Sequence, residues 1–345
     1  MKKSILAAAL LSCFASAGMA QSNVTIYGIM DASLARFDDG VNKVNRLDSG
    51  RNAASRLGFR GTEDLGGGLK AVFALESGMD ASNGTLSGSG AMWNRWSYVG
   101  LEGGFGGLRA GRQDSPMRTA LNVIDPFMNA GMAGSIDFFG YSPNGTPTTP
   151  ERVSNQLTYI LPGNLGGLNG SVAYVFGESG TAGPQPGSMW AGNVGYGAGP
   201  LAVQVAYSKQ NGTSATTDAT DFLAGATYDI GPVKLHAGVH LDKVESNVNG
   251  ADVANVRAFL VGVTVPLGDS LKLRSWYINN KEKVANNSNS SAFALSLSYA
   301  LSKRTQLYTT YLATRNDTLA AIPVVVDGVA GKNGTGLALG IQHNF

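Results

Sequence analysis

The chain has 345 residues, with 26 lysines and arginines against 24 aspartates and glutamates, and its mean hydropathy is −0.02. A formal net charge of +2 excludes the strongly basic surface of a nucleic-acid-binding protein, so no nucleic-acid partner is expected. Beyond the first residues, no stretch approaches the roughly 20 apolar residues that a membrane-spanning helix needs.

The N-terminus has the pattern of an export signal. Lys2 and Lys3 precede an apolar run over residues 5–14, and small residues at 15–20 form a cleavage site. This predicts a signal peptide over residues 1–20 and one domain over residues 21–345. Cys13, the only cysteine, lies within the signal, so the mature chain needs no disulfide. A lipid anchor on Cys13 is the less favoured alternative, because it would leave the cleavage site unused.

Apolar residues recur at every second position along most of the remaining chain. The first such segment is residues 24–34. Others are residues 69–76, 168–176, 201–208, 293–301 and 335–345. A period of two predicts β-strands with one face in an apolar environment and the other in water. Two segments are less clear: residues 191–196 alternate weakly, and Tyr308 and Tyr311 have opposite parity, so the faces of strand 305–315 stay unassigned.

Short turns alternate with long polar connections. The predicted turns are residues 64–68, 103–107, 162–167, 197–200, 231–232, 266–270 and 302–304, and the predicted loops are residues 38–53, 80–90, 177–187, 210–219, 246–250, 283–290 and 316–332. Turns at one end and loops at the other are typical of a transmembrane antiparallel barrel, and counting the segments gives 16 strands. A soluble β-sandwich, which also alternates, remains the less favoured alternative.

One connection, at about residues 113–150, is far longer than an ordinary loop. It mixes apolar residues with a few acids, including Asp125 and Asp137. Such a composition differs from that of a solvated linker. We therefore expect this segment to fold into the barrel and narrow it.

Arginines near this connection share a parity. If Leu57 and Phe59 face lipid, Arg56 and Arg60 face the lumen. A charge on the lipid face would cost about 2–4 kcal/mol at the midplane, which favours the water-filled interior.

The same reasoning applies to two further segments. It directs Trp96 and Tyr98 outward and Arg95 inward. It also directs Val153, Leu157 and Tyr159 outward and Arg152 inward.

Several motifs resemble those of the trimeric general porins of Gram-negative outer membranes, in particular the β-proteobacterial type. They are Val24-Thr-Ile-Tyr-Gly28 with Asp31, the segment from Ser55 to Lys70, Tyr98-Val-Gly-Leu101, Leu108-Arg-Ala-Gly-Arg112, Tyr299-Ala-Leu-Ser-Lys-Arg-Thr305 and the terminal Gly-Ile-Gln-His-Asn-Phe345. The resemblance implies an all-β, 16-stranded barrel, a homotrimer, and a third extracellular loop folded into each pore.

The resemblance also implies site residues. It matches Arg56, Arg95 and Arg152 to the basic wall of the constriction and Asp125 to its loop acid, and it leaves the second loop acid open. Arg60, from its parity, and Asp137, as a further acid of the long connection, complete the two predicted sets. Asp31, Lys70 and Glu76 are further lumen candidates, and Phe345 would be the signal read by the barrel-assembly machinery. Two family features are missing. Asp125-Pro-Phe-Met128 replaces the Pro-Glu-Phe-Gly loop motif, and Ile29 stands where a first-strand lysine is common.

These features together predict an outer-membrane channel for passive diffusion of small hydrophilic solutes and ions, with mild anion preference and no cofactor. Outer-membrane lipids and lipopolysaccharide are expected partners. A channel specific for a sugar or an organic acid is the alternative, since Trp276 shares parity with Lys272 and Arg274. A barrel enzyme is less favoured, because His236 and His240 share a face but no third zinc ligand converges on them.

Overall fold

A computed structural model describes residues 23–345 except 89, 141–150, 178–185, 213–216, 287 and 325–328. The predicted signal peptide, residues 1–20, lies outside the described residues. Within the described part, none of the helices has the length and apolar character required to cross a membrane.

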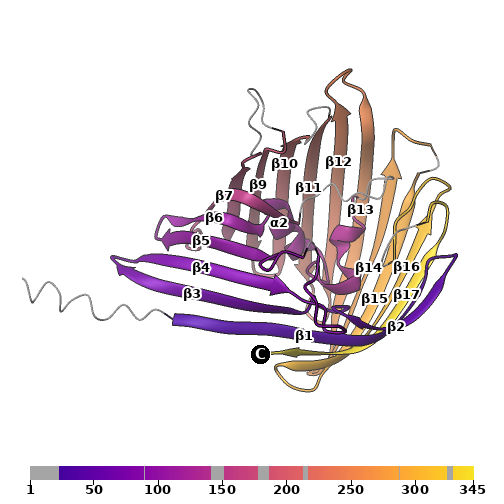
Figure 1. Ribbon diagram of the computed structural model, residues 1–345, viewed down its shortest axis with the longest axis horizontal. Coiled ribbons are helices and arrows are strands. Elements are labelled where there is room, and N and C mark those ends of the chain that lie inside the picture. Colours follow the sequence, from indigo (N-terminus) through magenta and orange to yellow (C-terminus); the bar gives the residue numbers. More distant parts are fainter. Residues whose placement is uncertain are drawn as a thin grey trace, which may run out of the picture.

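The described chain is dominated by one antiparallel sheet of 17 strand segments (Figure 1). These are β1 (Asn23–Asp38), β2 (Lys43–Ser49), β3 (Arg56–Gly66), β4 (Leu69–Gly78), β5 (Trp96–Gly103), β6 (Gly106–Asp114), β7 (Arg152–Ile160), β8 (Leu168–Val175), β9 (Met189–Ala198), β10 (Leu201–Asn211), β11 (Thr217–Asp229), β12 (Lys234–Ser246), β13 (Asp252–Leu267), β14 (Leu271–Glu282), β15 (Ser290–Ala300), β16 (Thr305–Asn316) and β17 (Gly334–Asn344).

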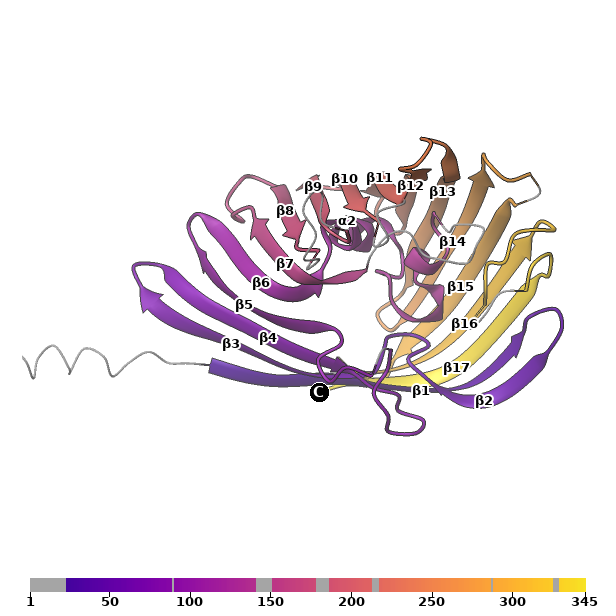
Figure 2. The same cartoon turned by 45° about the horizontal axis from the view of Figure 1, so that its top comes forward.

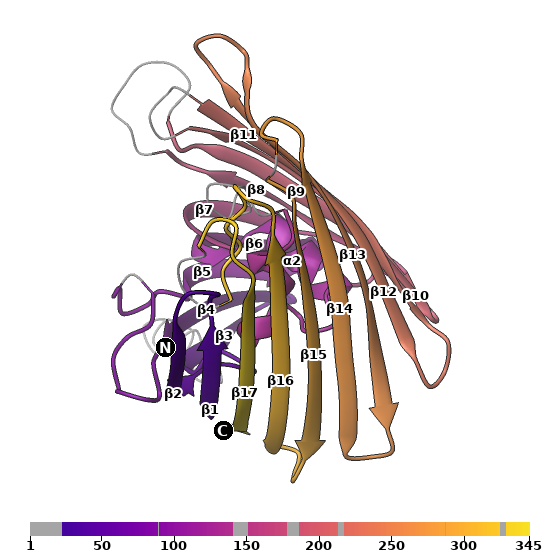
Figure 3. The same ribbon diagram turned by 90° about the vertical axis from the view of Figure 1, so that its right-hand side faces the viewer.

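The sheet closes on itself because β17 pairs with β1 along residues 29–38 of the first strand. On its other edge, β1 pairs with β2 through residues 32–38 and with β3 through residues 23–29. β2 and β3 therefore share one strand position in the barrel, so the 17 segments form a 16-stranded barrel. Figure 3 shows β13–β17 side by side as they approach this seam. The predicted 16-stranded antiparallel barrel is confirmed.

The first long connection differs from its prediction. Residues 38–53 were expected to be a loop, but they contain β2, and β1 runs on to Asp38. The polar sequence of β2 conceals a strand because most of its side chains are exposed and lack the alternation of a half-buried strand. The weakly predicted strand near residues 191–196 is present as β9.

Alternation in β17 has the predicted phase. Leu337, Leu339 and Ile341 are exposed on the outer face, whereas Ala338 and Gln342 are buried on the inner face. The structure also assigns the faces of β16, where Tyr308 is buried inside and Tyr311 is exposed outside.

Large aromatic side chains are exposed on the outer wall near both ends of the strands. Phe105, Tyr196, Tyr228, Tyr299 and Phe345 lie near the short turns, and Phe176, Trp190, Tyr207 and Phe222 lie toward the opposite end. Two such sets are the aromatic girdles of a barrel that crosses a bilayer. The turn and loop ends also follow the prediction, with the longest connections, residues 79–95, 115–151, 176–188 and 317–333, all at the end opposite the short turns.

The connection between β6 and β7 carries the helix α2 (Pro116–Ile124) and the short 3₁₀ helices η1 (Gly131–Ala133) and η2 (Ser135–Asp137). Ser115 caps α2 by accepting a hydrogen bond from the Arg118 backbone N–H, and Pro116 begins its first turn. Figure 2 shows α2 on the inner side of the strands, beside β9–β11.

We call the described part of this connection, residues 115–140, the inner loop, and its helix α2 packs against β8–β12. Its apolar side chains form the main buried cluster together with inward residues of β1, β10, β11 and β13–β17. The loop contributes Met117, Ala120, Leu121, Ile124, Phe127, Met132, Ala133, Ile136, Phe138 and Phe139. Because the loop is packed on that side, open space in the lumen remains along the wall formed by β3–β9.

Candidate functional site

A cavity of about 310 Å³ lies between the inner loop and the wall of β3–β7. Charged side chains dominate its lining, and we call it the neck. They are the arginines Arg51, Arg56, Arg95, Arg118 and Arg152, and the acids Asp114, Asp137 and Glu151. The structure thus brings together three of the four predicted wall arginines and one of the two predicted loop acids.

Glu76 holds two of the neck arginines. Its carboxylate pairs directly with the Arg95 guanidinium and lies 3.8 Å from Arg56 Nη1. The Tyr27 hydroxyl donates a further hydrogen bond of 3.0 Å to Glu76. This buried carboxylate therefore fixes both arginines in position and neutralises part of their charge.

Of the remaining arginines, Arg51 pairs with Asp48 at 2.8 Å, and the other two share two acids at the ends of the long connection. Asp114 lies 3.0 Å from Arg152 and 3.5 Å from Arg118, and Glu151 lies 2.9 Å from each of these arginines. The Trp96 indole N–H donates to Asp114 at 3.1 Å. The network ties α2 to the first residues of β7, so that one cationic side chain of the neck comes from the loop itself.

The prediction that Trp96 and Tyr98 face lipid is wrong. Val99 and Leu101 are the exposed outer residues of β5, which turns Trp96 and Tyr98 toward the lumen. Arg95 still reaches the neck because it precedes β5 and is not bound by the strand's alternation. Aromatic residues are compatible with either face of a barrel strand, so they set the phase poorly.

Val153 is a second misplaced residue. It packs against Val175, Met189 and Ala191 in a small buried cluster instead of facing outward. The pairing of β6 and β7 shifts register in this region, and Asn155 has a φ of 56°. A bulge of this kind re-aims the neighbouring side chains and breaks the parity on which the prediction relied.

Three other candidates lie in the lumen but outside the neck. Arg60 is exposed, and its guanidinium carbon stacks 5.2 Å from the centre of the Tyr27 ring. Lys70 is exposed at the start of β4, close to the short turns. Asp31 is fully buried and accepts hydrogen bonds from the backbone N–H groups of Asn52 and Ala53, so it supports the break between β2 and β3.

Asp125 does not line the neck and is only 1% exposed. Its carboxylate accepts backbone hydrogen bonds of 2.8–2.9 Å from Phe127, Asn129 and Ser135. These bonds stabilise a turn in which both Met128 and Asn129 have positive φ. Asp125 is an acid of the loop, as predicted, but it is buried and stabilises the backbone of the loop instead of lining the neck.

Asp137 occupies the place that was expected for a loop acid, since its side chain is exposed and lines the neck. The protein around it removes hydration and Glu151 adds a negative charge, and both effects raise the pKa of Asp137. Water in the cavity reaches the carboxylate and limits the desolvation. Asp137 is therefore an acid that titrates above an ordinary aspartate.

Four residues of the neck escaped prediction: Arg51, Arg118, Asp114 and Glu151. Arg118 had one signal, as a single cation in the otherwise apolar and polar-neutral segment 116–124. Arg51 enters the neck only because the chain breaks between β2 and β3, and that break was not visible in the sequence.

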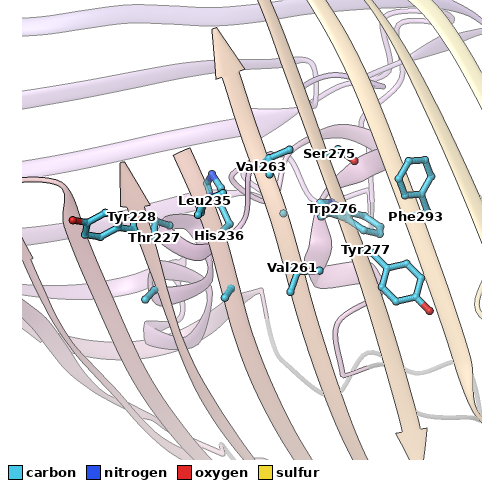
Figure 4. Close-up of a pocket in the computed structure, with 13 residues that line it drawn as sticks. Thr227, Tyr228, Leu235, His236, Val261, Val263, Ser275, Trp276, Tyr277 and Phe293 are labelled. Carbon is cyan, nitrogen blue, oxygen red and sulfur yellow. The ribbon is translucent and has the colours of Figure 1, made fainter. Parts of the chain in front are cut away.

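Other cavities lie away from the neck. One of about 350 Å³ continues along β5–β9 and contains Arg109, which stacks 5.0 Å from the Tyr98 ring centre. A larger one, of about 550 Å³, lies on the outer wall between β11 and β15 (Figure 4). Its exposed residues, Tyr228, Leu235, Val261, Tyr277 and Phe293, make it a depression in the apolar outer surface.

His236, His240 and Trp276 do face the lumen, as their parity indicated, but the inner loop covers them. Each contacts a backbone carbonyl of that loop. Among the described residues, no group of three or more His, Cys, Asp or Glu side chains is arranged to hold a metal ion.

Phe345, the last residue, continues the pairing between β17 and β1 that closes the barrel. The backbone N–H and C=O of Phe345 exchange hydrogen bonds of 3.1 and 3.0 Å with Gly28 of β1. The ring of Phe345 lies over Gly28 so closely that a Cβ there would overlap it.

Comparison with known proteins gives a consistent picture. Residues 7–319 match the family model described as Gram-negative porin. The chain is 33% identical over 360 aligned residues to outer membrane porin protein 32 of Delftia acidovorans, with 100% of both chains covered. It is 30% identical over 400 residues to an outer membrane porin of Bordetella pertussis, again over 100% of both. Its structure is similar to that of an anion-selective porin from Comamonas acidovorans, at a TM-score of 0.84 and 31% identity, covering 94% of this chain and 100% of that chain.

Proposed function

The chain belongs to the Gram-negative porin family and forms an outer-membrane channel, and we propose that its neck passes small hydrophilic solutes and ions with a mild preference for anions. The observation that carries the preference is the charge of the neck, where five arginines face three acids. Two buried carboxylates outside the lining reduce the excess of positive charge further: Glu76 pairs with Arg95 and Asp48 pairs with Arg51. The structural relative described as anion-selective supports the same sign.

The size of the preference follows from pairing and screening. Every neck arginine lies within 4 Å of a carboxylate, including Arg51, which pairs with Asp48 at 2.8 Å. The charges therefore cancel in large part, and only a small net field remains at the neck. Salt screens charges over about 8 Å at 0.15 M, and rings of charge select ions modestly in a wide aqueous pore. The loop narrows the lumen, while opposed charges hold oriented water that an apolar solute would have to displace.

Planar-bilayer recording tests this function. The reversal potential in a KCl gradient should have the sign of chloride preference. The current should rise linearly with voltage, and the conductance should rise with salt concentration. A cation-selective reversal potential would contradict the proposed sign. Saturable block by one sugar or organic acid would favour the alternative, a substrate-specific channel.

The cavity along β5–β9 is the observation that keeps this alternative open. Its lining includes Arg109 stacked on Tyr98, and it also includes Ser171 and Asn193, whose side chains share a 2.6 Å hydrogen bond. Aromatic, cationic and amide groups in one cavity would suit a hydroxylated or carboxylated solute.

The assembly of the protein is also part of the proposal. A cleaved signal over residues 1–20 would export the chain, Phe345 would mark it for the barrel-assembly machinery, and the short turns would lie at the periplasmic end. A homotrimer surrounded by outer-membrane lipids and lipopolysaccharide is the expected state, supported by the family and by the apolar outer wall. Light scattering of the detergent-purified protein should give three times the monomer mass after subtraction of the micelle.

A further inference from the structure

Four side chains on the wall hold the inner loop by its backbone. On β12, His236 Nδ1 lies 2.8 Å from the Ile124 carbonyl and His240 Nδ1 lies 3.0 Å from the Phe139 carbonyl. On β14, the Trp276 indole donates to Ala133 at 2.7 Å and the Asn280 amide donates to Phe138 at 2.8 Å. Every loop acceptor in this set is a main-chain oxygen.

His240 differs from the other three because both of its ring nitrogens face acceptors. The Phe139 carbonyl lies beside Nδ1, and Asp221 Oδ1 lies 3.2 Å from Nε2. A neutral imidazole has one N–H, whereas an imidazolium has two. With Asp221 ionised, both hydrogen bonds form together only when His240 carries the second proton.

The surroundings supply the balancing charge. Asp221 on β11 and Asp242 on β12 are both buried inward residues, and the Ser208 hydroxyl on β10 donates to the other oxygen of Asp221 at 2.9 Å. On the remaining side, β13 presents Ala258 in register with His240, and the loop presents the Phe139 ring at 5.6 Å. A buried cation is stable only beside such paired carboxylates.

His236 provides an internal contrast. Its Nε2 lies 3.1 Å from the Thr264 hydroxyl, which can donate as well as accept. A neutral His236 with its proton on Nδ1 therefore satisfies both contacts. The two histidines share one face of β12 and both hold the loop, yet only His240 needs a second proton to do so.

We propose that His240 is a positioning residue that works as an imidazolium, holding the inner loop at Phe139 against β12 and so fixing the width of the neck. Two observations connect this contact to the neck. Gly140 has a φ of +86°, and a Cβ there would overlap His240 Nδ1, so the backbone is fitted to the ring. Asp137, which lines the neck, lies two residues before Phe139. This role rests on the proposed channel function, but the protonation of His240 does not.

Nitrogen-15 NMR of the histidine rings tests the protonation directly. The chain has three histidines, so H240Q and H236Q variants assign the signals of these two by loss. At about pH 8 in detergent micelles, where an ordinary histidine is neutral, His240 should show two protonated ring nitrogens and His236 one. A neutral His240, including the case in which Asp221 carries the proton instead, would overturn the proposal whether or not the protein conducts.

Single-channel recording tests the consequence for the loop. Wild-type channels should show little open-channel noise at about pH 8, where the imidazolium holds the loop. H240Q should be noisier than the wild type at that pH, G140A should share that behaviour, and H236Q should stay close to the wild type. H240Q channels as quiet as the wild type would refute the positioning role. If the wild-type protein formed no channel, the proposed function would be refuted, and the NMR result alone would decide the protonation of His240.

Discussion

The Tyr308 hydroxyl donates a 2.6 Å hydrogen bond to Asp31, joining the next-to-last strand to the first. The bond passes over β17 at Gly340, where a Cβ would crowd the Tyr308 hydroxyl. Asp31 also accepts from the N–H groups of Asn52 and Ala53. One buried carboxylate thus connects the closing seam of the barrel to the break between β2 and β3.

Tyr308→Phe should destabilise the barrel by about 1.5–3 kcal/mol, the range for a hydrogen bond to a charged group, because Asp31 stays buried with one donor fewer. Tyr311→Phe is the matched control, since Tyr311 lies on the same strand and faces outward. Urea unfolding of the two variants in micelles measures the difference. Equal midpoints would show that the seam does not depend on this bond.

Neutralising neck arginines should reduce anion preference. Arg152→Gln and Arg118→Gln each remove one positive charge from the lining, so the reversal potential in a KCl gradient should shift toward cation preference. Arg60→Gln removes the same charge elsewhere in the lumen and should shift it less. A larger effect from Arg60 than from either neck arginine would place the selectivity filter elsewhere.

Anion preference should depend on pH through Asp137. Loss of hydration beside the packed loop and the negative charge of Glu151 raise the pKa of Asp137 to about 7, compared with about 4 for an ordinary aspartate. As the pH falls through 7, Asp137 takes up a proton, the neck loses a negative charge and anion preference increases. Asp137→Asn should resemble the low-pH wild type at every pH. Reversal potentials recorded from pH 5 to pH 8 check both statements, and an equally steep pH response in the variant would assign the titration to another group.

Gly28 should be intolerant of any side chain. In Gly28→Ala the new Cβ would overlap the Phe345 ring, so closure of β17 against β1 should fail or slow. Gly104→Ala is the control, because no atom lies within 4 Å of the Cβ position there. The fraction of heat-modifiable, folded barrel after refolding measures closure. Similar yields for the two variants would mean that the terminal ring can move aside without cost.

The strands were predictable because lipid and water impose opposite demands on alternate residues. In β17, Leu337, Leu339 and Ile341 satisfy that rule without interruption, and the predicted faces are observed. The rule failed where lipid contact does not act. β2 is polar and exposed, Val153 follows a register shift, and the aromatic pair Trp96 and Tyr98 suits either face.

The neck was predictable only in part, for a related reason. Arg56 lies on a strand whose phase was clear, and it was placed correctly in the lumen. Its partner Glu76 was identified as a lumen residue, but its pairing with Arg95 depends on which strands are neighbours and at what height. Asp125 and Asp137 are both acids in one loop, and only the fold shows that one is enclosed by backbone N–H groups while the other meets water.

The contacts that position the inner loop involve different atoms from those that set the charge of the neck. The wall side chains that hold the loop form hydrogen bonds with its backbone carbonyl oxygens, which every residue type provides. They are His236, His240, Trp276 and Asn280. Loop side chains that point toward the neck, such as Arg118 and Asp137, take no part in those hydrogen bonds. Substitution of those side chains during evolution can therefore change the ion preference of the channel, while the backbone contacts that fix the position of the loop are kept.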